Sequence, residues 1–227
     1  MKRVVIAVDG PSGAGKGTVA RAVARALGYR HVDTGAMYRA VAWAVVRRAG
    51  GPGEAAKVAS ESTIDIADGR TSIDGQDVTS AIRTPEIDRA SAAVARDPDV
   101  RAALVARQRA LGAQGGVVME GRDIGTVVFP HAEVKVYLDA SPEERARRRA
   151  ADPAHSSGKG GDVAHVAEDL AARDKSDSTR SVAPLTRAAD AAYIDTTGMP
   201  IEDVVARVLA VVASRVGTRD QGPGPRA

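Results

Sequence analysis

The segment RDKSDSTR, residues 173–180, places two arginines and an aspartate where they could act on one ligand. On a helix, Arg173, Asp177 and Arg180 lie at positions i, i+4 and i+7, so the three side chains share one face. Such a face either carries a solvent-exposed ion pair or forms a clamp, that is, a binding site for an anionic ligand that also carries hydroxyl groups. In a clamp the guanidinium groups bind an anion and the carboxylate accepts hydrogen bonds from hydroxyls. The segment by itself leaves both interpretations open.

A glycine-rich stretch near the N-terminus supplies the second chemical signal. Residues 10–18 read GPSGAGKGT, with G-x-x-x-x-G-K between the apolar run RVVIAVDG and a helical pattern. In such a loop, successive backbone N–H groups and the helix N-terminus bind phosphate oxygens, and the lysine reaches the terminal phosphates. We therefore expect an ATP-type ligand to be bound by Gly10, Pro11, Ser12, Gly13, Ala14, Gly15, Lys16, Gly17 and Thr18.

The position of the hydroxyl in this loop narrows the class of protein. Thr18 comes two residues after Lys16, so the Lys-Ser or Lys-Thr pair of GTPase-type switches is absent. The sequence GKGT resembles instead the loop of nucleoside monophosphate kinases. A kinase also needs a site for its acceptor, and basic residues recur in four separate segments, DTGAMYR, VRAALVARQR, EGRDIG and RDKSDSTR.

The basic residues of these segments are arginines. A planar guanidinium binds a phosphate through two parallel hydrogen bonds, whereas a lysine acts as a point charge. A single arginine of this kind would ordinarily be a surface residue, but the phosphate-binding loop favours convergence of several. The predicted ligands of one acceptor phosphate are Arg39, Arg122, Arg173 and Arg180.

Composition limits the classes of function. The 227 residues suit one α/β domain with an insertion, and 44% hydrophobic residues are enough for a core. Aromatic residues make up only 3%, which disfavours a nucleic-acid-binding module that stacks bases. There is no cysteine, the net charge is only +3, and neither a signal-peptide pattern nor a membrane-length apolar run occurs. We expect a cytoplasmic protein that binds neither membrane nor nucleic acid.

The elements that must position these residues alternate between strand and helix. Apolar runs typical of buried strands are RVVIAVDG, YRHVDT, GGVVME, EVKVYLDAS and AAYIDTTG, and helical periodicity follows most of them. Ser141 to Glu144 has the pattern of a capping box at the start of an arginine-rich helix. This alternation predicts a parallel sheet with helices on both faces.

Residues 51–82 have a different character. The stretch STIDIADGRTSIDGQDVTS alternates in polarity and contains two Asp-Gly pairs, which are strong hairpin signals. We predict a small antiparallel insertion, followed by two helices. Asp97 and Pro98 have the residue types of an N-cap and a first helical position for the second of these helices.

On these motifs the chain resembles the bacterial cytidylate kinases, from Val4 to about Gly198. The most family-specific motifs are GRDIGTVVFP and R-D-x-x-D-S-x-R, supported by DGPSGAGKGT, DTGAMYR, IRTPEI, VRAALVARQRA and VYLDAS. The resemblance implies a three-layer P-loop NTPase-type α/β fold with a nucleotide-monophosphate-binding insertion and a mobile lid. The expected boundaries are 1–50, 95–150 and 174–216 for the core, 51–94 for the insertion, 151–173 for the lid and 217–227 for a disordered tail.

The resemblance also implies an activity, the ATP-dependent phosphorylation of CMP and dCMP with Mg²⁺, in a protein expected to be a monomer. It gives Lys16, Arg122, Arg173 and Arg180 a catalytic role, and it brings Arg148 and Arg149 to the ATP phosphates. Thr18 would orient Mg²⁺ directly or through water. The implied CMP site comprises Thr34, Tyr38, Arg39, Arg101, Arg122, Asp123, Arg173, Asp177 and Arg180.

Within that site, the resemblance assigns the ribose hydroxyls to Asp177 and the base to Arg101 and Asp123. The chemistry agrees, because cytosine offers an amino donor to a carboxylate and two acceptors to a guanidinium. Uracil would set a carbonyl against Asp123. One departure concerns the position where the family has a serine near the base: this chain has Ala92 there, with Ser91 one residue earlier.

Two other interpretations remain. One is another P-loop kinase that acts on UMP, AMP, dTMP, a sugar or a shikimate-type acceptor, which Arg101, Asp123 and the hairpin insertion disfavour. The other is a nucleotide-binding regulator without transferase activity, which the acceptor arginines disfavour. An assay with a panel of nucleoside monophosphates separates these possibilities.

Overall fold

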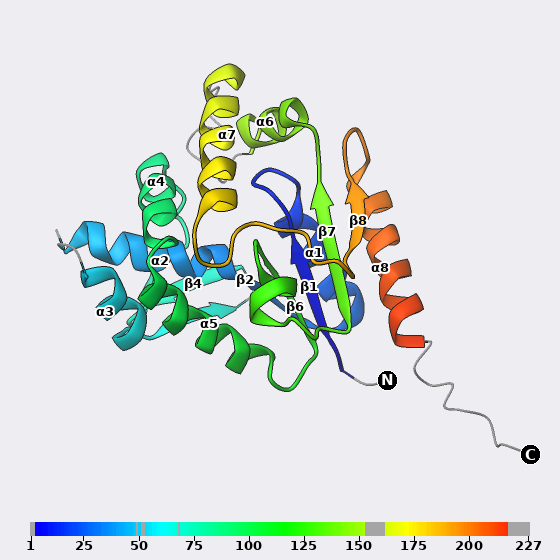
Figure 1. The fold of residues 1–227 in the computed structure, drawn as a ribbon, viewed down its shortest axis with the longest axis horizontal. Coiled ribbons are helices and arrows are strands. Elements are labelled where there is room, and N and C mark those ends of the chain that lie inside the picture. Colours follow the sequence, from blue (N-terminus) through cyan, green and yellow to red (C-terminus); the bar gives the residue numbers. More distant parts are fainter. Residues whose placement is uncertain (1–2, 49, 51–52, 68, 153–161, 218–227) are drawn as a thin grey trace, which may run out of the picture.

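The computed structural model describes residues 3–48, 50, 53–67, 69–152 and 162–217. At its centre is a five-stranded parallel sheet in the order β2-β6-β1-β7-β8 (Figure 1). The predicted parallel sheet is confirmed, and all five predicted strand segments contribute to it. The strands are β1 (Val5–Asp9), β2 (Arg30–Asp33), β6 (Val117–Gly121), β7 (Val134–Asp139) and β8 (Ala192–Asp195).

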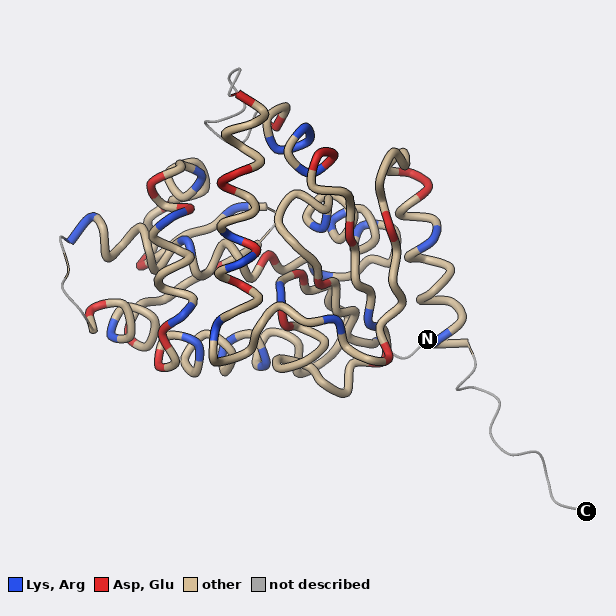
Figure 2. The backbone as a smooth tube through the Cα atoms, turned by 45° about the horizontal axis from the view of Figure 1, so that its top comes forward, with Lys and Arg blue, Asp and Glu red and all other residues tan. Residues whose placement is uncertain are grey.

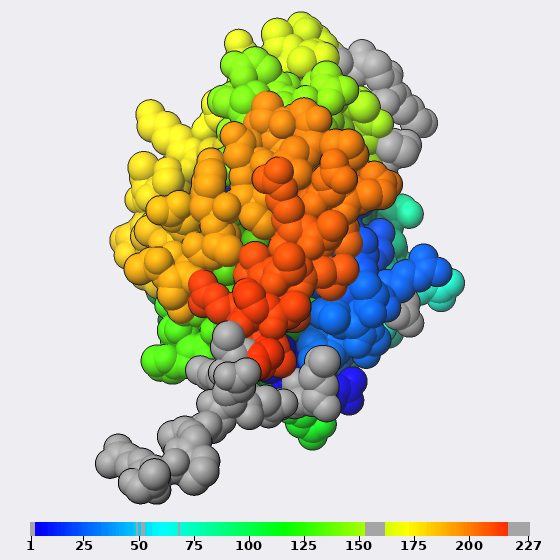
Figure 3. Space-filling view, turned by 90° about the vertical axis from the view of Figure 1, so that its right-hand side faces the viewer, coloured from blue at the N-terminus to red at the C-terminus, as the bar shows by residue number. Residues whose placement is uncertain are grey.

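Both faces of this sheet are covered by helices, which is why β1 is apolar up to its last residue. Ile6 and Val8 belong to a core shared with α1 (Lys16–Leu27) and α8 (Ile201–Gly217). Val5 and Ala7, on the opposite face of the strand, pack in a second core with α5 (Pro98–Gly112) and with η1 (Ile124–Val128), a short π-helix. Figure 3 shows α8 covering the end of the molecule beyond β8.

The insertion contains the predicted antiparallel strands, β3 (Ile64–Ala67), β4 (Arg70–Ile73) and β5 (Gln76–Asp77). At the second Asp-Gly pair, Asp74 and Gly75 have φ values of 50° and 78°, as a tight hairpin requires. Residues 51–82 also contain a helix that was not predicted from the sequence, α3 (Glu54–Glu61), which precedes the strands. Its Val58 and Ala59 are buried against α2 (Thr34–Arg47), and this tertiary packing favours the helix.

The two helices predicted after the insertion are α4 (Pro85–Val94) and α5. Asp97 caps α5 as expected, since its carboxylate accepts from the backbone N–H groups of Asp99 and Val100 at 2.9 and 3.3 Å. Pro98 follows it inside the first turn. Two more helices, α6 (Pro142–Ala150) and α7 (Val163–Thr179), pack against each other beyond the sheet (Figure 1).

Only half of the predicted capping box at the start of α6 forms. The Ser141 hydroxyl accepts from the backbone N–H of Glu144 at 3.2 Å. The reciprocal bond is replaced, because the Ser141 N–H donates to Thr197 at 2.9 Å and the Glu144 carboxylate binds Arg147 and Arg148. The serine therefore still begins the helix, but the glutamate orients arginines.

Strand register brings the carboxyl ends of β1, β2 and β6 to one edge of the sheet. Asp9 pairs with Gly121, and Asp33 pairs with Glu120. In open α/β sheets this edge is where ligands bind. Helices α6 and α7 stand next to it in Figure 1, so elements from both ends of the chain surround one region.

The domain boundaries remain predictions. Part of the expected lid, residues 153–161, and residues 218–227 of the expected tail lie outside the described residues. Residues 163–173 of the expected lid belong to α7. Among the described helices, none has the length and hydropathy needed to cross a membrane. Figure 2 shows basic and acidic residues interspersed along the chain, in agreement with the small net charge of +3.

Candidate active site

The glycine-rich loop joins β1 to α1 and has the backbone conformations that its glycines permit. Gly15 precedes the helix with φ 85°, a left-handed conformation that glycine adopts readily. Gly10 has φ 146°, and a Cβ there would lie 1.9 Å from the carbonyl oxygen of Leu138. Lys16 is buried, and its Nζ donates to the carbonyl oxygen of Pro11 at 2.6 Å. The loop is therefore built as predicted for phosphate binding.

The same loop is attached to α6 and α7 through Ser12. The Arg145 guanidinium donates to the Ser12 carbonyl at 3.1 Å, and an Asp174 carboxylate oxygen accepts from the Ser12 N–H at 3.3 Å. Arg145 and Asp174 also form an ion pair with each other. Gly13 packs so closely on α6 that a Cβ would lie 2.9 Å from the Cβ of Arg145. Helices α6 and α7 therefore hold the loop through hydrogen bonds to its backbone and, at Gly13, through close packing.

The loop borders a cavity of about 1000 Å³ that extends across the carboxyl edge of the sheet to α5 and α7. Sixteen predicted site residues line it: Ser12, Gly13, Ala14, Gly15, Lys16, Gly17, Thr18, Thr34, Tyr38, Arg39, Arg101, Arg122, Asp123, Asp177, Arg173 and Arg180. Arg148 and Arg149 line it too. Of the residues predicted to bind ATP, Gly10 and Pro11 do not border the cavity and shape the loop from behind.

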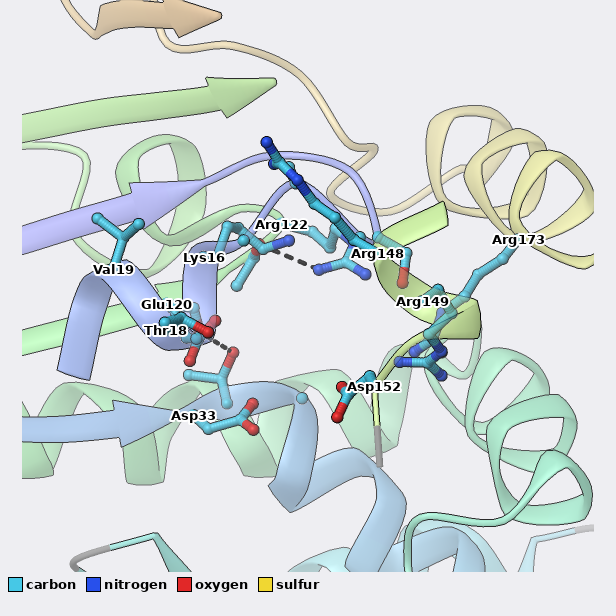
Figure 4. A pocket seen from close by; sticks show the side chains of 18 of the residues that line it. Lys16, Thr18, Val19, Asp33, Glu120, Arg122, Arg148, Arg149, Asp152 and Arg173 are labelled. Carbon is cyan, nitrogen blue, oxygen red and sulfur yellow. Dashed lines mark hydrogen bonds between the residues drawn. The ribbon is translucent and has the colours of Figure 1, made fainter. Parts of the chain in front are cut away.

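The three arginines of α6 that helical spacing places on one face have different environments. Arg145 is turned to the loop backbone and is buried there. Arg148 borders the cavity and donates to the hydroxyl of Thr196 at 2.9 Å. Arg149 reaches across to Asp88 of α4. Figure 4 shows Arg149 and Arg173 entering the cavity from the side opposite Thr18, Glu120 and Asp33.

The structure brings Arg173, Asp177 and Arg180 of the segment RDKSDSTR together at the cavity. The Asp177 carboxylate accepts from Arg122 Nε at 2.9 Å and lies 3.6 Å from Arg180 Nη1. Arg173 and Asp177 lie on α7, and Arg180 ends it as the residue after the last turn. The three side chains and Arg122 therefore meet at one wall of the cavity, and only 6% of Arg180 is exposed.

Arg101 and Asp123, the pair that the family resemblance assigns to the base, form a buried ion pair. Arg101 Nη2 donates to Asp123, and the Arg101 guanidinium stacks 5.6 Å from the centre of the Tyr38 ring. Asp123 is held by Asp9, which accepts from the N–H groups of the next two residues, Ile124 and Gly125, at 2.8 and 2.7 Å. The last residue of β1 thus directly precedes the phosphate-binding loop and fixes the backbone that follows Asp123.

The serine that is displaced by one position also lies at this cavity. Ser91 and Ala92 both border it. The Ser91 hydroxyl donates to the carbonyl oxygen of Asp88 at 2.9 Å, which uses its hydrogen inside α4. Ala92 presents a methyl group where the resembling family has a hydroxyl.

Burial and like charges perturb several of these groups. Burial, followed by the charge of Arg122, lowers the pKa of Lys16 from 10.5 to about 7. Burial also lowers the pKa of Arg173 to about 10, together with the charges of Arg39 and Arg122. Burial raises the pKa of Asp9 to about 6 although two backbone N–H groups oppose it. An added negative charge is therefore favourable beside Lys16 and Arg173, whereas the buried Asp9, which does not line the cavity, disfavours its own charge.

Sequence reasoning missed several residues at this cavity. Asp33 and Glu120 end strands β2 and β6, and the rule for carboxyl edges of parallel sheets could have found them. Thr196 follows β8 and binds Arg148, a contact that the same rule would suggest. Asp88 and Asp174 do not line the cavity but bind residues that do, and they had no such signal because their partners are distant in sequence.

Comparisons with known proteins show the family of the chain. The family model for cytidylate kinase matches residues 6–214. A cytidylate kinase of Solibacter usitatus is 46% identical over 225 residues, which cover 95% of this chain and 94% of the relative. One of Desulfitobacterium hafniense is 48% identical over 96% of each chain.

Among solved structures, a gluconokinase from Sinorhizobium meliloti has a similar fold. Its TM-score is 0.53 at 16% identity, and the match covers 98% of this chain and 99% of that one. This likeness concerns the fold alone. The family follows from the sequence relatives, and it confirms the resemblance seen in the motifs: the chain belongs to the cytidylate kinase family.

Proposed function

We propose that this chain transfers the γ-phosphoryl group of ATP to CMP and dCMP, with Mg²⁺ on the donor phosphates. The observation that carries the proposal is one cavity with N–H donors and cationic side chains on two of its walls. The phosphate-binding loop forms one wall, and the guanidinium groups around Asp177 form the other, beside the Arg101–Asp123 pair. The family membership supports the same reaction.

The donor phosphates would occupy the loop. The backbone N–H groups of the loop and the N-terminus of α1 attract phosphate oxygens, and Lys16, the first residue of α1, lies beside them in the cavity lining. Arg148, fixed by Glu144 and Thr196, supplies a further positive charge from α6. Each of these groups is held in place before the ligand arrives, so little reorganisation is needed.

The acceptor would lie along the opposite wall. Its phosphate meets Arg39, Arg122, Arg173 and Arg180, all of which border the cavity. Asp177, already between two arginines, is the acceptor for ribose hydroxyls. The base reaches the Arg101–Asp123 pair, and its amino group replaces part of the Arg101 contact on Asp123. Thr34 and Tyr38 complete the lining.

The residues near the loop fit Mg²⁺, which prefers oxygen ligands and usually keeps water and substrate phosphates in its shell. The Thr18 hydroxyl and the Asp33 and Glu120 carboxylates line the same part of the cavity (Figure 4). Thr18 would hold the ion directly or through water, and the carboxylates would bind its water ligands. When bound, the ion would neutralise charge on the donor phosphates.

The reaction needs no general base, because the acceptor oxygen belongs to a phosphate that is mostly ionised near neutral pH. The difficulty is the approach of two polyanions and the charge on the moving phosphoryl group. Lys16 from the donor side, and Arg122 and Arg180 from the acceptor side, offset that charge. The burial of Lys16 and Arg180, and the partial burial of Arg122, strengthen these interactions relative to bulk water.

A panel of nucleoside monophosphates tests the function directly. With ATP and Mg²⁺ present, we expect ADP formation to be fastest with CMP and dCMP in a coupled assay. UMP should react more slowly, because it leaves Asp123 without an amino donor. Activity with AMP alone would reject the assignment of the base site.

Replacing Arg180 with alanine tests the acceptor wall. We expect the Arg180→Ala variant to lose about a hundredfold or more of kcat/KM for CMP, since a preorganised donor in a dry site contributes that much. Circular dichroism should show that the variant stays folded. The exposed arginine seven residues further on gives a matched control, and Arg187→Ala should retain wild-type turnover. Equal turnover in both variants would contradict the role of Arg180.

The Asp123→Asn variant tests base selection. The amide presents a donor as well as an acceptor, so it can face the uracil carbonyl that the carboxylate repels. An unpaired buried polar group costs about 1–3 kcal/mol, so the ratio of kcat/KM for CMP to that for UMP should fall by about 5- to 150-fold. The assay compares both substrates in variant and wild type. A preserved ratio would show that another group reads the base.

The pKa of Lys16 gives a pH-dependent prediction. A base whose pKa falls from 10.5 to about 7 binds fewer protons in the folded than in the unfolded protein between those values. Stability of the empty protein therefore rises with pH above about 7, relative to a Lys16→Met variant that lacks this group. Thermal unfolding of both proteins across that pH range checks this. The unfolding temperature of Lys16→Met should exceed that of wild type, and the difference should become smaller as the pH increases. A gap independent of pH would contradict it.

A further inference from the structure

A single carboxylate outside the predicted site binds three arginines from three different helices. Asp88 of α4 accepts from Arg39 Nε of α2 at 2.9 Å and from Arg173 Nη1 of α7 at 3.3 Å. Its other oxygen accepts from Arg149 Nη2 of α6. Two of these arginines are assigned to the acceptor phosphate, and the third to the donor side.

The place of Asp88 relative to the cavity decides what it can do. All three arginines border the cavity, whereas Asp88 is not among the described residues that line it. The carboxylate therefore approaches the guanidinium groups from behind. Each guanidinium has five N–H donors, so the contact with Asp88 leaves donors for a phosphate on the cavity side.

The charge balance explains why such a carboxylate is needed. Three guanidinium groups gathered on one side chain repel one another, and the burial of Arg173 makes that repulsion stronger. Burial would raise the pKa of Asp88, but the charges of Arg39, Arg173 and Arg149 lower it well below its ordinary range. The three guanidinium groups therefore favour the ionised form of the Asp88 carboxyl.

We propose that Asp88 is a positioning residue for the transfer reaction, which holds Arg39, Arg149 and Arg173 with their free N–H donors towards the cavity. This inference rests on the proposed acceptor site. It assigns no contact between Asp88 and either substrate. In the opposite role, Asp88 would be an internal anion that competes with the acceptor phosphate for the same arginines. Removing its charge would then strengthen CMP binding, whereas loss of a positioning residue weakens it.

The Asp88→Asn variant separates the two roles. The amide has nearly the same shape but lacks the charge, and its NH₂ group repels a guanidinium. At metal sites, partners that orient the ligating groups contribute about 10- to 100-fold to affinity or activity, and we expect loss of the Asp88 charge to raise KM for CMP by a similar factor, about tenfold. KM for ATP and kcat should change less, because only Arg149 belongs to the donor side. Asp88→Glu keeps the charge and should bring KM back towards the wild-type value.

The matched control is Glu86→Gln, an equal loss of charge in the same first turn of α4 at an exposed residue. This variant should have wild-type KM for both substrates. A second readout does not depend on turnover: saturating CMP without ATP should raise the unfolding temperature of Asp88→Asn less than that of wild type. Should Asp88→Asn fail to fold, Asp88→Ser takes its place: it removes the same charge with a smaller side chain, and KM for CMP should again rise.

An unchanged or lowered KM for CMP in a folded Asp88→Asn variant would overturn the inference, and a lowered KM would establish competition. These outcomes are distinct from failure of the proposed function. If wild-type protein does not phosphorylate CMP, the proposed function is wrong. If wild type is active and Asp88→Asn behaves like it, only the role of Asp88 is wrong.

Discussion

Positive charge held at close range inside a buried cavity is the constraint on which the structure depends. Two unit charges 4 Å apart interact by about 4 kcal/mol at an effective dielectric constant of 20, so guanidinium groups do not gather without counter-charges. Here Asp177 lies between Arg122 and Arg180, and Asp123 accepts from Arg101. These carboxylates reduce the repulsion among the arginines, and the guanidinium groups still have N–H donors with which to bind an anion.

This constraint also explains why the groups come from so many elements. One helix face offers only a few side chains with the same direction, so a phosphate surrounded by guanidinium groups needs several helices. The parallel sheet brings strand ends to one edge, and α2, α6 and α7 converge on that edge (Figure 1). On α7, the neighbours Arg173 and Asp174 serve opposite sides of the cavity: one borders it with the acceptor arginines, and the other binds the loop at Ser12.

Much of this arrangement could be predicted from the sequence, because the relevant signals are local. The apolar run before GPSGAGKGT fixes a buried strand and a phosphate-binding loop, and the Asp-Gly pair at 74–75 fixes a hairpin. Helix α3 was missed, since eight residues specify a helix only through burial of Val58 and Ala59. The π-helix η1 was missed as well, because its N–H groups depend on Asp9, more than a hundred residues away.

Asp88 shows the same limit most clearly. Its three partners are 49, 61 and 85 residues away in the chain. In the sequence it resembles an ordinary acidic residue in the first turn of a helix, where it would interact with the helix dipole. Only the folded protein shows that its side chain is committed elsewhere.

The contacts of Arg145 and Asp174 with Ser12 have an evolutionary consequence. A loop whose backbone is bonded to two helices from the other half of the chain cannot be exchanged as an isolated cassette between kinases. Gly13 restricts it further, because its packing on α6 leaves no room for a side chain. Recombination among relatives should therefore be tolerated where the loop, α6 and α7 come from the same parent. A hybrid that takes the loop from one parent and the two helices from another should lose the contacts that hold the loop backbone in place.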